Sequence, residues 1–472
     1  MSTGLLNIAI IGAGASGTIT AIQLLNKLST KANIFLIEKK EQTLFRGAAY
    51  SSQLVYEPLN VQSGRMSIYN HLPDHFYDWV VANRQAQSET EITRDSFVSR
   101  RWFGDYLTEN FEEAKQQSEN VTVEIVLAKC TDIAFNSADE CYTLSFESRD
   151  DIQVDYLVFA CGNEPPADVL EKEKVLGGKY ISNPWTGNPF EKLKANEDVL
   201  LIGMGLTMVD HVVSLQKSQH KGKIFCFSRN GYLPLPHAPI QQFVFDMNQE
   251  AKEVKQVLDA LWQNLTLAKG QDISWQNVMD ALRPYTAGIW KRMSLDSKKY
   301  FLKRLRSYWE IHRHRMPVAS ANYLKELEGA GQLKFIAGSI QSVDCKDDTM
   351  VVHYIAKGDK NESTLAVHHI INCTGPSSDY YKTSNTLFKN LLNKGWMKQD
   401  ALKLGIETGV RGEIIKSNGV VLNHAFSIGP LRKAMEWETT AIREIRTQAE
   451  NVALAIVLPS LKNYEMAVET GL

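Results

Sequence analysis

Residues 7–38 constrain the fold more than any other part of the chain. They begin with a short apolar run at residues 8–11, which is typical of a buried parallel strand. A Gly-x-Gly-x-x-Gly sequence at residues 12–17 follows at once, then apolar residues at helical spacing, then a β-branched run that ends in Glu38. This order of strand, glycine-rich turn, helix, strand and acid predicts a unit that binds an adenine dinucleotide.

The glycines of this motif have separate physical roles. Gly12 permits the tight turn, Gly14 lets backbone N–H groups approach a pyrophosphate, and Gly17 lets the helix pack closely on the strand. The partial positive charge at the helix N-terminus favours the phosphates. Glu38 lies where a carboxylate can accept hydrogen bonds from ribose hydroxyls. The predicted site also includes Ala13, Ala15, Ser16 and Lys39.

Length and composition narrow the class of protein. A chain of 472 residues is long enough for two or three domains. A net charge of −2, from 52 basic and 54 acidic residues, gives no reason to expect nucleic acid or an anionic membrane as a partner. The apolar runs at residues 199–209 and 452–458 are too short to span a bilayer, so we expect a cytoplasmic protein. We expect its partner to be a small-molecule substrate.

The six cysteines are scattered and contain no Cys-x-x-Cys pair, which argues against a zinc site and against a redox-active disulfide. We expect them to be reduced thiols, and we expect no bound metal. They are Cys130, Cys141, Cys161, Cys226, Cys345 and Cys373.

An internal repeat predicts the architecture. A second strand–turn–helix–strand pattern covers residues 198–227, with the sequence Gly-Met-Gly-Leu-Thr-Met at residues 203–208. Strand-like segments follow each copy and end at the similar tripeptides of residues 160–162 and 373–375. Two copies of one plan predict an α/β protein with two Rossmann-like dinucleotide-binding domains. The tripeptides and the second turn add Cys161, Gly162, Gly203, Gly205, Leu206, Thr207 and Gly375 to the predicted sites.

The two copies differ at the position that contacts the adenosine ribose and so determines which dinucleotide binds. Both Glu38 and Arg229 lie 26 residues after the first glycine of their motif, and Ser228 precedes the arginine. A carboxylate favours a free ribose 2′-hydroxyl, whereas a guanidinium beside a hydroxyl favours a 2′-phosphate. We therefore predict FAD in the first site and NADPH, with NADH possible, in the second. Met208 replaces the third glycine, so a purely structural strand–turn–helix is the alternative.

Residues 239–330 form a mostly helical insert that is rich in tryptophan and arginine. Its densest part, residues 308–317, contains two histidines and two arginines without a pattern of metal ligands around them. This segment is a solvated basic helix end, or a basic pocket for NADPH phosphates or an anionic substrate.

Several segments, which run in order through nearly the whole chain, match one family: residues 12–17, 47–51, 59–67, 97–107, 203–210, 309–317, 372–376 and 429–449. On these segments the chain resembles the FAD–NAD(P)-binding family of bacterial flavoproteins. These are relatives of the two-dinucleotide-binding-domain flavoproteins that include flavin monooxygenases and glutathione-reductase-like enzymes. The resemblance implies an FAD domain made of residues 1–180 and 331–472, with an NAD(P) domain and its helical insert at residues 181–330.

The resemblance also implies further flavin contacts. The loops around residues 49–50 and 59–67 look like those that meet the flavin, and the turn at residues 429–430 resembles the one that presents the C-terminal helix to the flavin and its ribityl chain. The usual Gly-Asp of glutathione-reductase-like enzymes is Gly-Pro here. The residues implied are Ala49, Tyr50, Asn60, Arg65, Met66, Ser67, Gly429 and Pro430.

These features together predict an FAD-dependent NAD(P)H oxidoreductase, preferably a monooxygenase that hydroxylates a small molecule. The absence of a cysteine pair disfavours a disulfide reductase, and residues 228–229 resemble the NADPH site of flavin monooxygenases. We assign no catalytic residue, because the flavin carries the chemistry. The alternatives are a reductase or oxidase that does not oxygenate, and a non-catalytic redox sensor that binds FAD.

Overall fold

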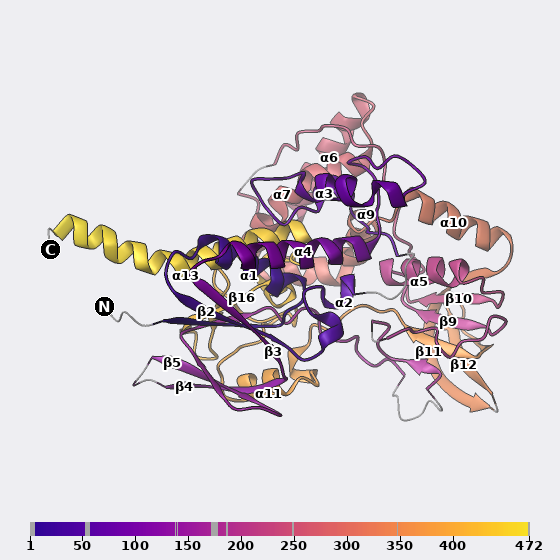
Figure 1. Ribbon diagram of the computed structural model, residues 1–472. Coiled ribbons are helices and arrows are strands. Elements are labelled where there is room, and N and C mark those ends of the chain that lie inside the picture. The colour runs from indigo at the N-terminus through magenta and orange to yellow at the C-terminus, as the bar shows by residue number, and fades with distance from the viewer. Residues whose placement is uncertain are drawn as a thin grey trace. The chain divides into compact units, whose positions relative to one another are not determined.

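The structure is a computed structural model that describes residues 5–51, 57–136, 138, 140–170, 178–185, 187–247, 250–346 and 348–470. The chain divides into two compact units. The first contains Met1–Ser51, Val61–Glu164 and Ser378–Leu472, and the second contains Ser52–Asn60 and Pro165–Ser377. Figure 1 traces the chain through both units by colour.

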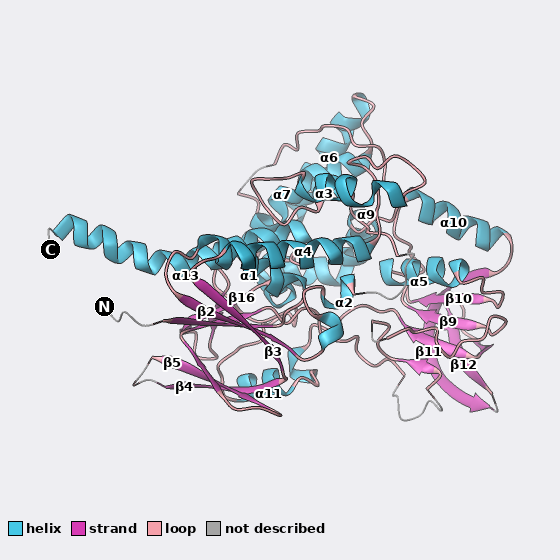
Figure 2. Ribbon diagram, viewed as in Figure 1, coloured by secondary structure: helices cyan, strands magenta, loops and turns pink. Residues whose placement is uncertain are grey.

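The first unit is built on a six-stranded sheet (Figure 2). Its strands lie in the order β15-β16-β7-β1-β2-β3, and neighbours are parallel except for the antiparallel pair of β15 and β16. The strand bounds are β1 (Leu6–Ile11), β2 (Ala32–Glu38), β3 (Val121–Leu127), β7 (Tyr156–Phe159), β15 (Glu413–Ile415) and β16 (Val421–Ser427). The strand and helix predicted at the N-terminus are confirmed.

The two faces of this sheet carry different layers. Helices α1 (Ala15–Lys27), α4 (Arg100–Gln117) and α13 (Ile442–Thr470) lie together along one face (Figure 1). On the other face Ala9 and Ile11 share a core with a three-stranded antiparallel sheet and with α11 (Thr386–Asn393). The alternation of side chains along β1 thus serves both layers. The strands of the small sheet are β4 (Cys130–Asn136), β5 (Cys141–Phe146) and β6 (Ile152–Val154).

The remaining elements of the first unit connect these layers. Two short helices, α2 (Gly47–Tyr50) and α3 (His75–Arg84), both pack on α4. The dense apolar run expected as one strand at residues 154–159 is split into β6 and β7 at Asp155. This residue bonds to Asn7 twice: its N–H donates to the carbonyl of Asn7 (2.8 Å), and its carboxylate accepts from the N–H of Asn7 (2.7 Å).

The second unit is built on a seven-stranded sheet of order β13-β12-β11-β10-β9-β14-β8. Strands β11, β10, β9, β14 and β8 are parallel, while β11, β12 and β13 form an antiparallel meander. The bounds are β8 (Tyr180–Ile181), β9 (Val199–Ile202), β10 (Ile224–Ser228), β11 (Leu333–Lys346), β12 (Thr349–Ala356), β13 (Glu362–Val367) and β14 (His369–Asn372). The sequence did not predict β13.

The unit boundaries differ from those expected at residues 180 and 330. Strand β11 pairs with β10, and β14 pairs with β9, so residues 331–377 belong to the sheet of the second unit. Residues 165–180 join the same unit, because β8 pairs with β14. Strand pairing therefore determines both boundaries of the second unit. The C-terminal segment of the first unit begins only at residue 378.

Helices of the second unit include α5 and those of the insert. Helix α5 (Leu206–Lys217) follows β9, and it packs against α10 (Val318–Gly329). The insert contains α6 (Val254–Gly270), α7 (Trp275–Arg292), α8 (Leu295–Tyr300), a π-helical turn (Phe301–Leu305) and α9 (Arg306–Arg313). The backbone of Leu235 bonds to both Ile311 (3.1 Å) and Met316 (3.0 Å), which ties the chain after β10 to the end of α9.

A buried histidine gives this unit a predicted pH dependence. His369 is 3% exposed, and its Nε2 lies 3.3 Å from a carboxylate oxygen of Glu197. Burial lowers the pKa of His369, against the opposing effect of Glu197, and burial likewise lowers the pKa of His220. Because the folded pKa lies below the unfolded value of about 6.5, the unfolded chain binds more protons. We expect this contribution to stability to be complete above about pH 6.5 and to be lost as the pH falls below it.

Urea unfolding at a series of pH values measures this effect, with His369→Gln as the comparison. The wild-type protein should lose more stability between about pH 7 and pH 5 than the variant does. Parallel pH dependences in the two proteins would contradict the assignment to His369.

Candidate functional site: two nucleotide cradles

The first nucleotide cradle consists of the Gly12–Gly17 loop, the N-terminus of α1 and Glu38. It lies at the carboxyl end of β1. Gly12 has φ +105°, and a Cβ atom there would lie 2.5 Å from the carbonyl oxygen of Ala160. A Cβ atom on Gly17 would lie 1.9 Å from the carbonyl oxygen of Gly12. Only glycine fits these two positions, so the roles predicted for both residues agree with the backbone geometry.

The N-terminus of α1 is open toward this cradle. Gly14 is its N-cap residue, no side chain caps the helix, and its first turn contains no acidic residue. Backbone N–H groups at this end therefore keep their partial positive charge for a phosphate. The N-terminus of α2 lies against it, because a Cβ atom on Gly47 would be 3.3 Å from the nitrogen of Ala15.

Glu38 is fixed at the edge of the same cradle. Its side chain is 9% exposed, and its two oxygens accept hydrogen bonds from the N–H groups of Ala13 (3.2 Å) and Lys39 (2.9 Å). Each carboxylate oxygen keeps acceptor capacity for a ribose hydroxyl. Glu38 therefore lies beside the glycine loop with its carboxylate oriented by these N–H groups, and its contact with a ribose stays a prediction.

The Gly429 turn closes on the N-terminus of α1. Gly429 has φ +72°, and a Cβ atom there would lie 3.2 Å from Oγ of Ser16. Both polar groups of the Gly429 backbone are bound by side chains: its N–H donates to Gln448 (2.7 Å), and its carbonyl accepts from Thr439 (2.7 Å). Gln448 also donates to Thr439 (2.8 Å), which locks the arrangement. Both residues lie in the matching segment 429–449, but the sequence did not single out Gln448 or Thr439 within it.

Gln448→Leu should loosen the Gly429 turn. The substitution leaves the buried N–H of Gly429 without its acceptor, which costs about 1–3 kcal/mol. Urea unfolding of the FAD-loaded protein measures the loss, and Thr447→Ala, an exposed change one residue earlier, should stay within about 0.5 kcal/mol of the wild type. Equal stability of Gln448→Leu and wild type would show that the bond does not hold the turn.

The other residues predicted for the first site lie in two segments beside the cradle. Ala49 and Tyr50 belong to α2, where burial raises the pKa of Tyr50 to about 12. Arg65 ends a 3₁₀ turn, and Met66 and Ser67 after it are buried. The carbonyl of Ser67 accepts a hydrogen bond from the guanidinium of Arg446 (2.8 Å), which fixes this loop to α13. Contact of these residues with a flavin stays a prediction.

Three further predicted residues have other surroundings. The Cys161 thiol donates to the carbonyl of Ile11 (3.3 Å), and burial raises its pKa, so it is no thiolate at neutral pH. Gly162 follows with φ +70° and open space where a Cβ would stand. Asn60 lies in the second unit, where its carbonyl accepts a hydrogen bond from Nε2 of His237 (3.2 Å).

The second cradle repeats the geometry of the first. A Cβ atom on Gly203 (φ +108°) would lie 2.4 Å from the carbonyl oxygen of Cys373, just as Gly12 meets Ala160. Gly375 has φ +84° and corresponds to Gly162. Gly205 caps α5 without a side-chain bond, and nothing lies within 4 Å of a Cβ atom there. The internal repeat inferred from the sequence is thus also a repeat of backbone geometry.

The first turn of α5 differs from that of α1, because Met208 replaces the third glycine. The Met208 side chain is fully buried in the core that α5 and α10 share. Its N–H donates to the carbonyl of Gly205 (3.1 Å), so one donor of the helix end is taken. The N–H groups of Leu206 and Thr207 remain in the turn that precedes this bond, where a phosphate can be bound.

The structural register corrects the residue matched to Glu38. The N–H of Gly12 donates to Ile37 (2.9 Å), and the N–H of Gly203 donates to Phe227 (2.8 Å). Ser228 therefore occupies the place of Glu38, and Arg229 the place after it. The equal spacing of 26 residues had paired Glu38 with Arg229, but the first interval is one residue longer in the structure. A hydroxyl thus replaces the carboxylate at the ribose position of the second cradle.

The basic segment at residues 308–317 is largely neutralised. Arg315 is 3% exposed, and its guanidinium donates to Asp280 (2.6 Å) and to the carbonyl of Gln276 (3.0 Å). Nδ1 of His314 lies 2.5 Å from a carboxylate oxygen of Glu310. Of the two interpretations left open, the buried pair of Arg315 and Asp280 disfavours a free anion-binding pocket at this arginine.

The described residues contain neither a cluster of metal ligands nor a membrane-spanning helix. No group of three or more His, Cys, Asp or Glu side chains there is arranged to hold a metal ion. None of the helices in the described ranges is both long enough and apolar enough to cross a bilayer.

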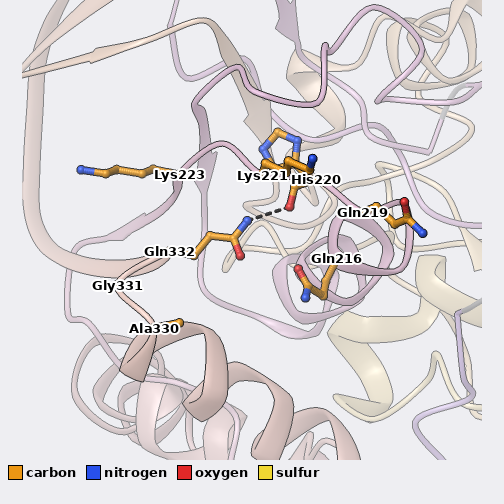
Figure 3. A pocket seen from close by; sticks show the side chains of 8 residues that line it. All are labelled: Gln216, Gln219, His220, Lys221, Lys223, Ala330, Gly331 and Gln332. Atoms are coloured by element: carbon orange, nitrogen blue, oxygen red, sulfur yellow. Dashed lines mark hydrogen bonds between the residues drawn. The ribbon is translucent and has the colours of Figure 1, made fainter.

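A depression of about 600 Å³ opens on the second unit (Figure 3). It lies where α5 ends and β10 begins, and Gln332 bridges its rim by donating to the carbonyl of His220 (2.8 Å). The cradle forms at the opposite end of these elements, so the depression is not part of the nucleotide site. Its lining is Gln216, Gln219, His220, Lys221, Lys223, Ala330, Gly331 and Gln332.

One family model matches the part of the chain that contains the first cradle. Residues 9–164 match the model of a family described as FAD-NAD(P)-binding, which confirms over this segment the resemblance inferred from the sequence. These residues contain the Gly12–Gly17 loop, Glu38 and the Cys161–Gly162 turn. No curated protein matches the chain by sequence.

Solved structures extend the likeness to nearly the whole chain. An ornithine N-hydroxylase from Kutzneria sp. 744 is 14% identical, with a TM-score of 0.64 over 96% of this chain and 99% of that one. L-lysine 6-monooxygenase from Pseudomonas syringae is 14% identical, with a TM-score of 0.66 and the same two coverages. A bacillithiol disulfide reductase from Bacillus cereus is 13% identical, with a TM-score of 0.54 and again these coverages. The chain therefore shares its overall fold with these three enzymes.

Proposed function

We propose that the protein is an FAD-dependent, NADPH-consuming monooxygenase that hydroxylates an amine-bearing small molecule. The observation that carries the proposal is the pair of similar cradles with opposite chemistry at the ribose position. Glu38 offers a carboxylate in the first, whereas Ser228 and Arg229 offer a hydroxyl and a cation in the second. A chain that binds FAD and NADPH separately is equipped to move electrons between them.

The residues of the first cradle fit FAD. The open N-terminus of α1 can hold the pyrophosphate, and Glu38 can accept from the ribose hydroxyls. The Gly429 turn, held by Gln448 and Thr439, lies beside Ser16 of the cradle and can contact the chain between pyrophosphate and flavin ring. When bound, FAD supplies the redox chemistry, accepting hydride from NADPH and passing two electrons to O₂.

The structural relatives favour an amine as the substrate. Three of them are an ornithine N-hydroxylase, an L-lysine 6-monooxygenase and a cadaverine monooxygenase. The reaction balances as one amine, one O₂, one NADPH and one proton giving one hydroxylamine, one water and one NADP⁺.

A disulfide reductase is the main rival, since one structural relative has that activity. It needs a reactive thiol or a route from flavin to an external disulfide. No disulfide joins any of the six cysteines, all of which lie in the described ranges, and burial raises the pKa of Cys161, the one that follows β7 beside the first cradle. The thiol chemistry of this chain therefore favours oxygenation over disulfide reduction.

The test follows FAD-loaded protein by absorbance under anaerobic NADPH, then after air is admitted with ornithine, lysine or cadaverine. Bleaching by NADPH, with reoxidation that yields an amine product containing one added oxygen atom, is the expected result. Reoxidation that gives only hydrogen peroxide with every amine would favour an oxidase or reductase. Flavin that NADPH does not reduce would favour a redox sensor.

A further inference from the structure

The loop after β10 presents a hydroxyl and an unpaired cation. Oγ of Ser228 accepts a hydrogen bond from the N–H of Gly231 (3.0 Å), which folds residues 228–231 into a turn and leaves the hydroxyl hydrogen for another acceptor. The side chain of Arg229 is exposed, and within the described ranges it has neither a salt bridge nor a hydrogen bond. Both groups can therefore bind a ligand without breaking an existing contact.

Lys357 brings a second cation to the same loop. It follows β12, and its N–H donates to the carbonyl of Ala337 (2.8 Å), the residue that pairs with Ser228 across β10 and β11. Nζ of Lys357 lies 3.5 Å from the carbonyl oxygen of Asn230 and 5.4 Å from the ring centre of Tyr232. Sheet register and these contacts thus hold the ammonium next to the residue that follows Arg229.

Helix α9 of the insert adds an aromatic side chain to the same loop. The hydroxyl groups of Tyr308 and Tyr232 lie 3.1 Å apart, and their ring centres lie 5.3 Å apart. Oγ of Ser307 accepts from Asn230 (3.2 Å). The π-helical turn at Phe301–Leu305 comes just before these residues, and such turns are frequent at functional sites. Tyr308 is 49% exposed, so its ring keeps open surface beside the cations.

We infer that Lys357 and Tyr308 complete an adenosine 2′-phosphate subsite at the carboxyl end of β10. Lys357 and Arg229 bind the phosphate from two directions, Ser228 donates to it, and Tyr308 packs against the adenine. The inference deepens the proposed function, since it names what makes the second cradle prefer NADPH. Two cations that lack carboxylate partners among the described residues are suited to a doubly charged phosphate.

The test is calorimetric binding of adenosine 2′,5′-bisphosphate and adenosine 5′-monophosphate to the FAD-saturated protein. Lys357→Ala should weaken binding of the bisphosphate about tenfold or more, because a charge-assisted bond is lost, and should change binding of the monophosphate less than about twofold. Lys360→Ala, an exposed lysine three residues further on, is the matched control and should leave both affinities unchanged.

Substitution of Tyr308 should change the two nucleotide affinities in a different way. Tyr308→Ala should weaken both nucleotides by a similar factor, about three- to tenfold, because the adenine is common to them. Equal losses for the two nucleotides in Lys357→Ala, or no change in either, would overturn the inference, as would a wild type that does not prefer the bisphosphate. Binding as expected without amine hydroxylation would refute the proposed function and leave the subsite standing.

Discussion

Gly14→Val is expected to yield protein that has lost most of its affinity for FAD. A Cβ atom at Gly14 would lie 3.0 Å from Cα and 3.4 Å from the nitrogen of Gly47, so α2 must move away from the cradle. The two γ-methyl groups would occupy the space in front of the α1 N-terminus where the pyrophosphate binds. Overpacking of this kind costs about 1–3 kcal/mol, which corresponds to about 5- to 150-fold weaker binding.

The measurement is the ratio of flavin to protein after purification, followed by titration of the apoprotein with FAD. Gly205→Val is the matched control in the second cradle, where nothing lies within 4 Å of a Cβ atom. This control should keep its FAD and lose reduction by NADPH. Circular dichroism spectra confirm that both variants fold. A Gly14→Val protein that retains a full complement of FAD would refute the assignment of the first cradle.

The parts of this fold that follow from local sequence could be predicted. Each βαβ unit is coded within about 30 residues by glycines and apolar periodicity, and the two cradles match almost atom for atom in the contacts of Gly12 and Gly203. The basic segment of the insert contained a local signal as well. Glu310 lies four residues before His314, a spacing that places the two side chains on one helix face.

The parts that depend on distant contacts could not be predicted. No local feature shows that β11, which follows an insert of roughly a hundred residues, returns to pair with β10. The same holds for Gln448 on the Gly429 backbone and for Lys357 beside Asn230, which lie 19 and 127 residues apart from their partners. Counting residues also misplaced the ribose position by one, because only the hydrogen-bond register shows which residue ends each strand.

That one-residue correction predicts the nucleotide specificity of two variants. Arg229→Ala removes an exposed cation that has no salt bridge in the described ranges, so its loss should not disturb the fold. We expect the apparent affinity for NADPH to fall about 10- to 100-fold, because one or more charge-assisted bonds to the 2′-phosphate are lost. NADH lacks that phosphate and should change less than about twofold. Arg292→Ala, an exposed arginine at the end of α7, is the control.

Ser228→Glu should go further and reverse the preference. It restores the carboxylate that Glu38 provides in the first cradle, where it can accept from a free 2′-hydroxyl but repels a 2′-phosphate. Anaerobic flavin reduction at varied NADPH and NADH gives both apparent affinities in one experiment. If Arg229→Ala lowered the affinities for the two nucleotides equally, or if Ser228→Glu left the affinity for NADPH unchanged, the second cradle would not recognise the 2′-phosphate. A reversal would show that the residue at the end of this strand selects the nucleotide, because a carboxylate and a hydroxyl on the same backbone then give opposite preferences.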